Sequence, residues 1–258
     1  MISKIKKILK KKNKSKIICI TAYSKNVAEA IDPYTDIILV GDSLGSVLYN
    51  YTTTRKVTLE QMLEHSKSAR LGIKSSLMVV DMPYRTYLNK KRALKNAKKI
   101  MQETKCDAVK LEGGSSIIKI VDHLVKNKIP VMGHLGILPQ SVKGKFKFKG
   151  KKNSERKKIF NDSRLLEKTG VFSIVLECVE STLAKKISKK LKIPTIGIGS
   201  SKFCDGQILV IDDLIGLNDT KVRFVKKFGQ IKKNISNAAK NFSKEVKNKK
   251  YPSKIYSY

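Results

Sequence analysis

The chain has few of the residues that mark specialised protein classes. Its 258 residues include no tryptophan and only four cysteines, none of them in a Cys-x-x-Cys pair. This spacing argues against a zinc site and against a disulfide framework, so we expect reduced thiols in a cytoplasmic protein. No stretch approaches the roughly 18 apolar residues that a membrane span needs, and residues 1–16 are too rich in lysine for a signal peptide. We expect no membrane partner.

Acidic residues are also scarce, with 21 Asp and Glu against 55 Lys and Arg, and the net charge is +34. Such a charge attracts nucleic acids and anionic membranes. Arginine, however, occupies only seven positions, and the lysines are spread over the whole chain. Proteins that read bases or phosphates favour the bidentate fork of arginine. We therefore interpret the charge as lysine on solvated faces and expect no dedicated nucleic-acid partner. A lysine-rich nucleic-acid-binding protein is the alternative from another class.

Eight short apolar runs are the clearest positive feature of the sequence. Most are continuous rather than alternating, which is typical of strands covered on both faces. Stretches with helical spacing lie between most of them, and this order predicts an α/β protein, a (β/α)8 TIM barrel. The predicted strands are Lys16–Ile20, Asp36–Val40, Ser76–Val80, Ala108–Glu112, Ile129–Met132, Phe172–Glu177, Pro194–Ile198 and Gln207–Ile211. The predicted helices are Leu59–Leu71, Leu88–Thr104, Ile117–Val125, Ser154–Thr169 and Ser181–Leu191.

We expect one domain over residues 1–258. Residues 1–15 predict a short basic amphipathic helix outside the barrel, and residues 218–258 predict C-terminal helices and a tail. The interval between Ile198 and Gln207 is too short for a helix. Residues 141–156 are expected to form a long loop over the barrel mouth. Six lysines of this loop would steer anionic substrates; they are Lys143, Lys145, Lys147, Lys149, Lys151 and Lys152.

Several apolar runs end in a carboxylate. Asp42, Asp81 and Glu112 end or follow predicted strands two to four, and Glu177 ends the sixth. The carboxyl ends of barrel strands form the catalytic rim, so we expect these acids to gather there. Hard oxygen ligands from adjacent strands suit Mg²⁺, and Asp42, Asp81 and Glu112 predict a magnesium site. The alternative is that each acid caps the helix that follows it.

Three side chains complete the predicted rim. Lys110 lies two residues before Glu112, so both side chains face the same side of the strand. Lys110 would bind an anionic substrate or form a structural ion pair. Glu177 lies across the barrel from the other acids and is placed for a general base; otherwise it caps the helix after Val179. His134, near the end of the fifth strand, is a possible secondary site residue.

Taken together, these segments resemble the ketopantoate hydroxymethyltransferase (3-methyl-2-oxobutanoate hydroxymethyltransferase) family. The matching stretches run in family order from about residue 17 to residue 217. They include Val40-Gly41-Asp42-Ser43-Leu44-Gly45, Val80-Asp81-Met82-Pro83, Val109-Lys110-Leu111-Glu112-Gly113-Gly114, Pro130-Val131-Met132-Gly133-His134-Leu135-Gly136, Pro139-Gln140-Ser141 and Leu176-Glu177-Cys178-Val179.

The resemblance implies a (β/α)8 barrel that assembles as a homodecamer. It implies transfer of the one-carbon unit of 5,10-methylenetetrahydrofolate to 3-methyl-2-oxobutanoate, giving 2-dehydropantoate for pantothenate synthesis. Carried over by motif, the Mg²⁺ site comprises Asp42, Asp81 and Glu112, the oxo-acid contacts are Asp42, Ser43, Asp81 and Lys110, and the proton acceptor is Glu177. The chemistry suits these residues, because the metal would polarise the ketone and stabilise the enolate left when the proton is removed.

A Mg²⁺-dependent lyase or mutase acting on oxo acids is the competing enzyme class, on a similar barrel. It would need a nucleophile or an acid in the loop after the fourth strand. This chain has Gly113-Gly114-Ser115-Ser116 there, with no cysteine, which favours the transferase.

Overall fold

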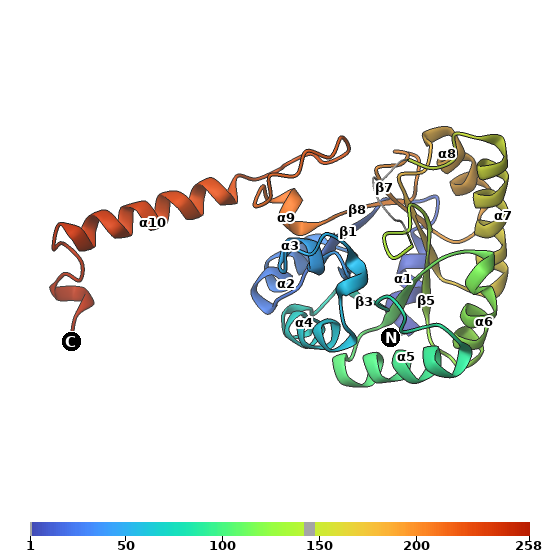
Figure 1. The fold of residues 1–258 in the computed structure, drawn as a ribbon, viewed down its shortest axis with the longest axis horizontal. Coiled ribbons are helices and arrows are strands. Elements are labelled where there is room, and N and C mark those ends of the chain that lie inside the picture. The colour runs from blue at the N-terminus through green and yellow to red at the C-terminus, as the bar shows by residue number, and fades with distance from the viewer. Residues whose placement is uncertain (1, 142–147) are drawn as a thin grey trace. The chain divides into compact units, whose positions relative to one another are not determined.

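Eight parallel strands form a closed barrel in the computed structural model, which describes residues 2–141 and 148–258 (Figure 1). Each strand pairs with the next in chain order, and β8 pairs with β1. The predicted (β/α)8 TIM barrel is confirmed. The strands are β1 (Ile17–Thr21), β2 (Ile37–Val40), β3 (Leu77–Asp81), β4 (Ala108–Glu112), β5 (Val131–Gly136), β6 (Ser173–Glu177), β7 (Thr195–Ile198) and β8 (Gly206–Leu209).

Burial explains why the strand sequences are continuous apolar runs. Every residue of β2, β3 and β4 is buried, because the barrel interior covers one face and helices cover the other. The predicted bounds of the fifth strand are wrong. β5 begins after Pro130, which has no N–H to donate to a neighbouring strand, and it continues through His134 to Gly136, paired with β6 along this length.

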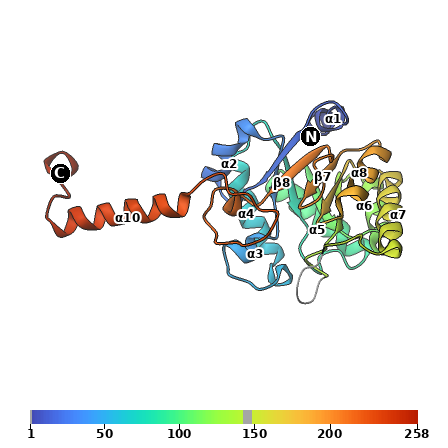
Figure 2. The ribbon, with the colours of Figure 1, turned by 90° about the horizontal axis from the view of Figure 1, so that it is seen from above.

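Helices surround the barrel (Figure 2). The five predicted helices are present with small shifts at their ends, and α2, which was not predicted, precedes β2. As expected, β7 leads directly into β8 with no helix between them. The helices around the barrel are α2 (Lys25–Ile31), α3 (Leu44–Val47), α4 (Leu59–Gly72), α5 (Lys90–Thr104), α6 (Ile118–Lys126), α7 (Asn153–Thr169) and α8 (Ser181–Lys190).

The predicted amphipathic helix at the N-terminus is α1 (Ile2–Lys10), and it packs on the barrel. Ile8 is buried in a cluster that also contains Ile17 and Ile208, at the N-terminal end of the strands. The Nζ atom of Lys4 donates to the carbonyl of Ser76 at 2.7 Å. The apolar face of α1 therefore closes the N-terminal end of the barrel, and Lys4 binds a loop at this end.

The chain divides into two compact units, Met1–Val210 and Ile211–Tyr258. The second contains α9 (Ile211–Leu214) and α10 (Ile231–Lys247) and begins earlier than the expected C-terminal region at residue 218. Backbone hydrogen bonds explain the earlier start, because the carbonyl of Leu214 accepts from Phe228 N at 2.7 Å. No residue of α10 is buried. The single-domain prediction for residues 1–258 stays a prediction.

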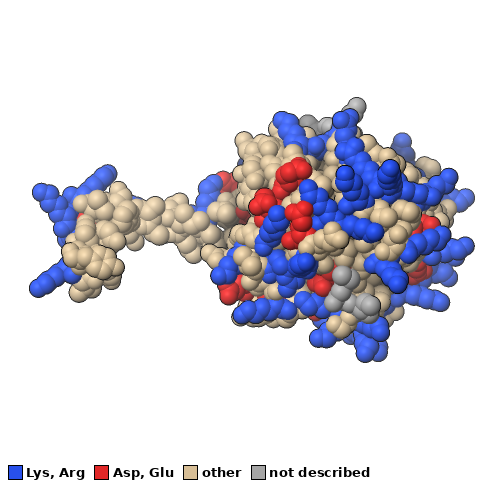
Figure 3. All heavy atoms as spheres, turned by 90° about the horizontal axis from the view of Figure 1, so that it is seen from below, with Lys and Arg blue, Asp and Glu red and all other residues tan. Residues whose placement is uncertain are grey.

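Two predictions concern the distribution of charge on the surface and the absence of a membrane-spanning helix. Basic side chains are spread over the face shown in Figure 3, with acidic ones between them, rather than confined to one stripe. Within the described ranges, no helix has the length and apolar character needed to cross a membrane. Lys143, Lys145 and Lys147 of the proposed steering loop lie outside the described residues, so that prediction stays open.

Candidate active site

Three carboxylates converge at the C-terminal end of the barrel. Asp81 and Glu112 are the last residues of β3 and β4, and Asp42 follows β2. All three are at most 5% exposed. The backbone N–H of Asp42 donates to Oδ2 of Asp81 at 3.0 Å, so the acids from β2 and β3 are in direct contact. The structure therefore brings the predicted acids together at one rim.

None of these acids caps a helix, so that alternative is wrong. α4 begins at a capping box formed by Thr58 and Gln61, and the side chain of Asn89 caps α5. The cap of α8 is Glu180, whose carboxylate accepts from the backbone N–H groups of Thr182 and Leu183. Glu177 is thereby free of the capping role that was its alternative.

Lys110 forms the central ion pair of the site. Its Nζ lies 2.8 Å from Oδ1 of Asp81, and both side chains are about 5% exposed or less. At this distance in a buried site the attraction between the charges is strong. Burial lowers the pKa of Lys110, but Asp81, Glu112 and Asp42 outweigh it and raise the pKa overall. Lys110 is therefore a fixed positive charge.

His134 connects the acid cluster with Glu177. Its Nδ1 lies 3.6 Å from Oε1 of Glu112, and its Nε2 lies 3.2 Å from Oε2 of Glu177. Burial and the charge of Lys110 lower the pKa of His134, but the two glutamates outweigh them and raise it to about 9. The imidazole thus lies between the two glutamates and holds Glu177, which is 21% exposed, at the open side of the cluster.

The cluster contains more negative than positive charge. Burial, then the neighbouring Asp81 and Glu112, raise the pKa of Asp42 well above its ordinary value. Burial also raises the pKa of Asp81 although Lys110 opposes it, whereas hydrogen bonds from His134 and Gln140 outweigh burial and lower that of Glu112. A buried surplus of carboxylates favours a cationic ligand or a proton.

Gln140 is a site residue that the sequence reasoning did not identify as functional. It is buried, and its backbone N–H donates to Oε2 of Glu112 at 3.0 Å. Its side-chain Nε2 donates to Oδ2 of Asp42 at 2.8 Å, and its Oε1 accepts from the hydroxyl of Tyr87 at 2.5 Å. Gln140 thus fixes two of the three acids. The motif Pro139-Gln140-Ser141 was the only sequence signal for it.

The remaining predicted contact, Ser43, lies at the same end of the barrel. Its Oγ is 2.8 Å from the hydroxyl of Tyr23 and the residue is only partly buried. Gly41, two residues earlier, allows this packing, since a Cβ there would lie 3.0 Å from Oγ of Ser43 and 3.4 Å from Oδ2 of Asp81. The serine hydroxyl can therefore donate to a ligand held beside the acids.

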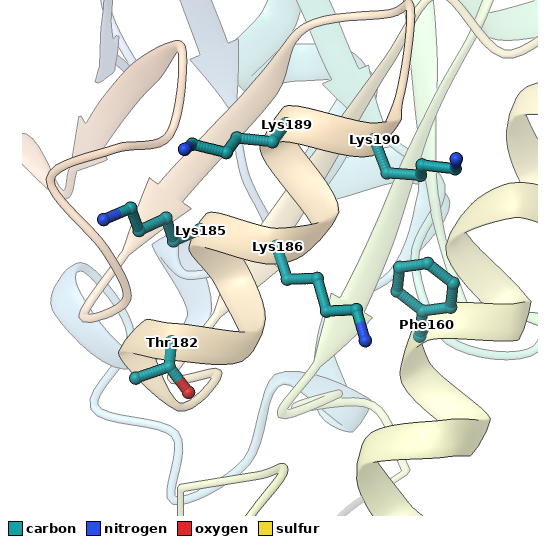
Figure 4. Close-up of a pocket in the computed structure, with 6 residues that line it drawn as sticks. All are labelled: Phe160, Thr182, Lys185, Lys186, Lys189 and Lys190. Carbon is teal, nitrogen blue, oxygen red and sulfur yellow. The ribbon is translucent and has the colours of Figure 1, made fainter.

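A surface groove between α7 and α8 lies outside the barrel and contains none of the predicted site residues (Figure 4). Phe160 lies on one side, and lysines from α8 line the other. The Nζ of Lys186 is 5.2 Å from the ring centroid of Phe160. The groove contains no carboxylate, so the candidate active site is the acid cluster at the mouth.

A buried set of acids, one lysine and one histidine at the carboxyl ends of parallel strands defines an enzyme of the (β/α)8-barrel class. The sequence matches the family model described as ketopantoate hydroxymethyltransferase over residues 2–254. The chain therefore belongs to the ketopantoate hydroxymethyltransferase family and is an enzyme.

Curated relatives agree with this assignment. The chain is 64% identical over 258 residues to the 3-methyl-2-oxobutanoate hydroxymethyltransferase of Pelagibacter ubique (strain HTCC1062), with 100% of both chains covered. It is 44% identical over 251 residues to the enzyme of that name from Helicobacter pylori (strain ATCC 700392 / 26695), covering 96% of this chain and 93% of the relative. These relatives identify the chemistry as hydroxymethyl transfer.

Solved structures show the fold alone. A 2,3-dimethylmalate lyase of the PEP mutase/isocitrate lyase superfamily aligns with a TM-score of 0.64 at 10% identity, covering 100% of this chain and 91% of the lyase. Phosphonopyruvate hydrolase in complex with oxalate and Mg²⁺ aligns with a TM-score of 0.62 at 10% identity, covering 98% of this chain and 93% of the hydrolase. Both likenesses agree with the closed barrel.

Proposed function

We propose that the chain transfers the methylene unit of 5,10-methylenetetrahydrofolate to 3-methyl-2-oxobutanoate, giving 2-dehydropantoate in the cytoplasmic synthesis of pantothenate. The observation that carries this proposal is a partly exposed Glu177, held by His134 beside a buried set of acids and Lys110. Such a set can bind an oxo acid and remove a proton next to its ketone. The four cysteines are all free thiols, which agrees with a reducing compartment.

The residues present fit a divalent cation. Asp42 and Asp81 are adjacent and buried, and the cluster that contains them has more negative than positive charge. Carboxylate oxygens of this kind suit Mg²⁺. In the described part of the chain, no three His, Cys, Asp or Glu side chains are arranged to hold an ion by themselves. Mg²⁺ commonly takes one or two carboxylates and completes its shell with water and substrate, so Asp42 and Asp81 would hold it directly.

Glu112 is the third proposed ligand, and its surroundings suggest how it would contribute. Its Oε2 already accepts the N–H of Gln140, and its Oε1 faces His134. It would reach the ion through the remaining lone pairs of these oxygens or through a water. When bound, Mg²⁺ would supply polarisation of the substrate ketone and stabilisation of the charge that develops on its oxygen.

The chain's own residues perform the remaining steps of the proposed reaction. Lys110 and the hydroxyl of Ser43 bind the carboxylate end of the oxo acid. A carboxylate oxygen of Glu177 removes the proton from the branched carbon, and the electron pair of that C–H bond moves toward the ketone oxygen. The imidazole Nε2 of His134, 3.2 Å from Glu177, fixes the orientation of the base. The branched carbon then bonds to the methylene carbon of the folate, whose two C–N bonds break. A water supplies the hydroxyl group of the product, and the folate leaves as tetrahydrofolate with the proton from Glu177 and one from this water on its nitrogens.

Assembly with further copies of the chain is part of the proposal, up to the decamer that the family resemblance implies. Ile235, Phe242 and Val246 lie on one side of α10, and each is 45–57% exposed. Spacings of seven and four residues place them on one stripe of the helix. A continuous apolar stripe of this kind marks a contact surface for another protein.

Deuterium exchange tests the proposed base. We expect Glu177→Gln to bind 3-methyl-2-oxobutanoate normally and to lose exchange of the branched-carbon proton, because the amide keeps the shape and lacks the basicity. The measurement follows the proton by NMR in D₂O without folate. The control is Glu180→Gln, which removes the charge of the residue that caps α8 and leaves the base. Exchange at the wild-type rate in Glu177→Gln would place the base elsewhere, and cleavage of an oxo acid without folate would favour the lyase class.

A further inference from the structure

Two arginines surround one tyrosine at the mouth of the barrel. Arg55 lies in the connection after β2, and Tyr84 and Arg85 lie in the connection after β3, so all three are at the carboxyl ends of the strands that carry Asp42 and Asp81. The Nη2 of Arg55 donates to the hydroxyl of Tyr84 at 2.5 Å, and its Cζ lies 4.3 Å from the centre of the ring. The Cζ of Arg85 lies 5.4 Å from the same centre.

The two guanidinium groups lie close together around one ring. Among the residues that the structure describes, no carboxylate lies within ion-pair distance of Arg55 or Arg85. Arg156, by contrast, has its Nη1 2.6 Å from Oε2 of Glu180. Two like charges held around one ring repel each other, and the aromatic face compensates only partly. A bound anion would remove this repulsion.

The backbone conformation of Arg85 is energetically unfavourable. Its φ is +66°, in the left-handed region that a non-glycine residue seldom adopts. Arg85 is exposed, and Arg55 and Tyr84 are partly exposed, so a ligand can reach all three. The two arginines also lower the pKa of the Tyr84 hydroxyl through hydrogen bonds. The strained backbone and the exposed arginines together suit an anion-binding position better than a packing role.

We propose that Arg55 and Arg85, arranged around Tyr84, bind the glutamate carboxylates of the folate co-substrate. Guanidinium forks pair with carboxylates through two parallel hydrogen bonds. The small oxo acid has its own cation in buried Lys110, whereas Arg85 is exposed and Arg55 partly exposed at the mouth, where the distal end of a longer co-substrate would leave the site. This inference rests on the proposed function, because it names the residues that hold the distal end of the proposed one-carbon donor.

The experiment compares two donors in four proteins. The donors are 5,10-methylenetetrahydrofolate and the corresponding methylenetetrahydropteroate, which has no glutamate. The proteins are the wild type, Arg55→Gln, Arg85→Gln and the control Arg164→Gln, an exposed arginine on α7. We expect each mouth substitution to raise KM for the glutamate-bearing donor roughly 10- to 100-fold, since it removes a charge-assisted pair. We expect kcat and KM for the oxo acid to stay near the wild-type values.

The donor without glutamate shows whether the arginines act on the carboxylates. The wild type should have a raised KM for this donor, and the mouth variants should show no further increase. Equal KM values for the glutamate-bearing donor in the wild type and both mouth variants would overturn the inference. A raised KM for the oxo acid alone would overturn it as well, by assigning the arginines to the other substrate. No turnover by the wild type with either donor would instead reject the proposed function.

Discussion

The two ends of the barrel both contain buried ion pairs, but they balance charge differently. At the N-terminal end, Oδ2 of Asp205 lies 2.8 Å from Nζ of Lys12 and accepts from N and Oγ1 of Thr195 at 2.9 and 3.0 Å. Asp205 is therefore paired with one lysine and accepts several hydrogen bonds. At the C-terminal end, the carboxylates of Asp42, Asp81 and Glu112 share Lys110 and His134.

This difference distinguishes buried charges that only stabilise the fold from buried charges that serve the function. A buried carboxylate with a full set of partners is stable as it stands and needs no ligand. A buried surplus of like charge is costly and persists where a ligand or a proton balances it. Burial of an acid in this barrel is therefore a poor guide to function, and the local balance of charge is the better one. Substitutions at each end test this distinction.

The largest effect is expected at the closed end, from Lys12→Met. Removing one partner of a buried pair leaves Asp205 charged and uncompensated, which costs about 3–5 kcal/mol of unfolding free energy. Urea unfolding measures the loss, and kcat per folded molecule should stay unchanged because the pair lies at the opposite end from the acid cluster. The exposed Lys14→Met is the control. A stable Lys12→Met variant with impaired kcat would contradict the division between the two ends.

At the mouth, Asp81→Asn should impair catalysis and leave stability nearly unchanged. We expect kcat/KM to fall by about 10²- to 10³-fold, the size seen when electrostatic stabilisation of a developing anion is removed. Unfolding free energy should change little, because the substitution also removes repulsion from Asp42 and Glu112. Steady-state kinetics over a range of Mg²⁺ concentrations makes the measurement. Near-normal turnover with an undiminished need for Mg²⁺ would reject the role of Asp81.

The stability that Asp32 contributes should depend on pH, and this dependence is a further test of the role of buried acids with a full set of partners. It is buried before β2 and accepts from the backbone N–H groups of Ser75 and Ser76 at 2.9 Å. Burial raises the pKa of Asp32, but these hydrogen bonds outweigh it and lower the value to about 2. A lowered pKa stabilises the folded state above about pH 4, and the contribution disappears as pH falls toward 2.

Asp32→Asn should therefore lower the unfolding free energy by about 2 kcal/mol at pH 7. The difference from the wild type should shrink below pH 4. Thermal unfolding from pH 7 down to pH 3 measures it. A deficit that is the same at both ends of this range would show that the charge of Asp32 contributes nothing to stability.

The smallest effect is expected from Gln140→Ala. Losing the hydrogen bond from the amide to Asp42 costs on the order of 1 kcal/mol, so we expect about a fivefold rise in the Mg²⁺ concentration that gives half-maximal activity. Direct titration of Mg²⁺ by calorimetry should show the same shift. Tyr87→Phe, which removes the contact to Oε1 of Gln140 and leaves the bond from Gln140 to Asp42, should have a smaller effect. An unchanged Mg²⁺ affinity in Gln140→Ala would show that Gln140 does not position the acids.

Much of this arrangement follows from local sequence patterns. Strands covered on both faces are continuously apolar, and short apolar runs, most of them continuous, indicated all eight strands. The acids were found because each ends or directly follows such a run. Lys110 was placed correctly beside Glu112 because residues two apart share a side of a strand.

Other features depend on contacts between distant parts of the chain. Gln140 reaches Asp42, 98 residues away, from a loop that has no periodic pattern. The burial of Ile8 on the barrel and the hydrogen bonds from Lys4 to the loop at Ser76 likewise come from tertiary packing. α2 was missed because seven residues are too few to show a clear helical period. Sequence patterns therefore predicted the strand ends and left the loop partners to the structure.

The unburied surface of α10 has a consequence for experiments at different protein concentrations. A helix of 17 residues, none of them buried, is only marginally stable in water. If copies of the chain associate through its apolar stripe, the helix content of residues 231–247 becomes a function of concentration, rising with assembly and falling on dilution. Far-UV circular dichroism during serial dilution would then report association of the chain, while catalysis at the barrel mouth is followed separately by turnover.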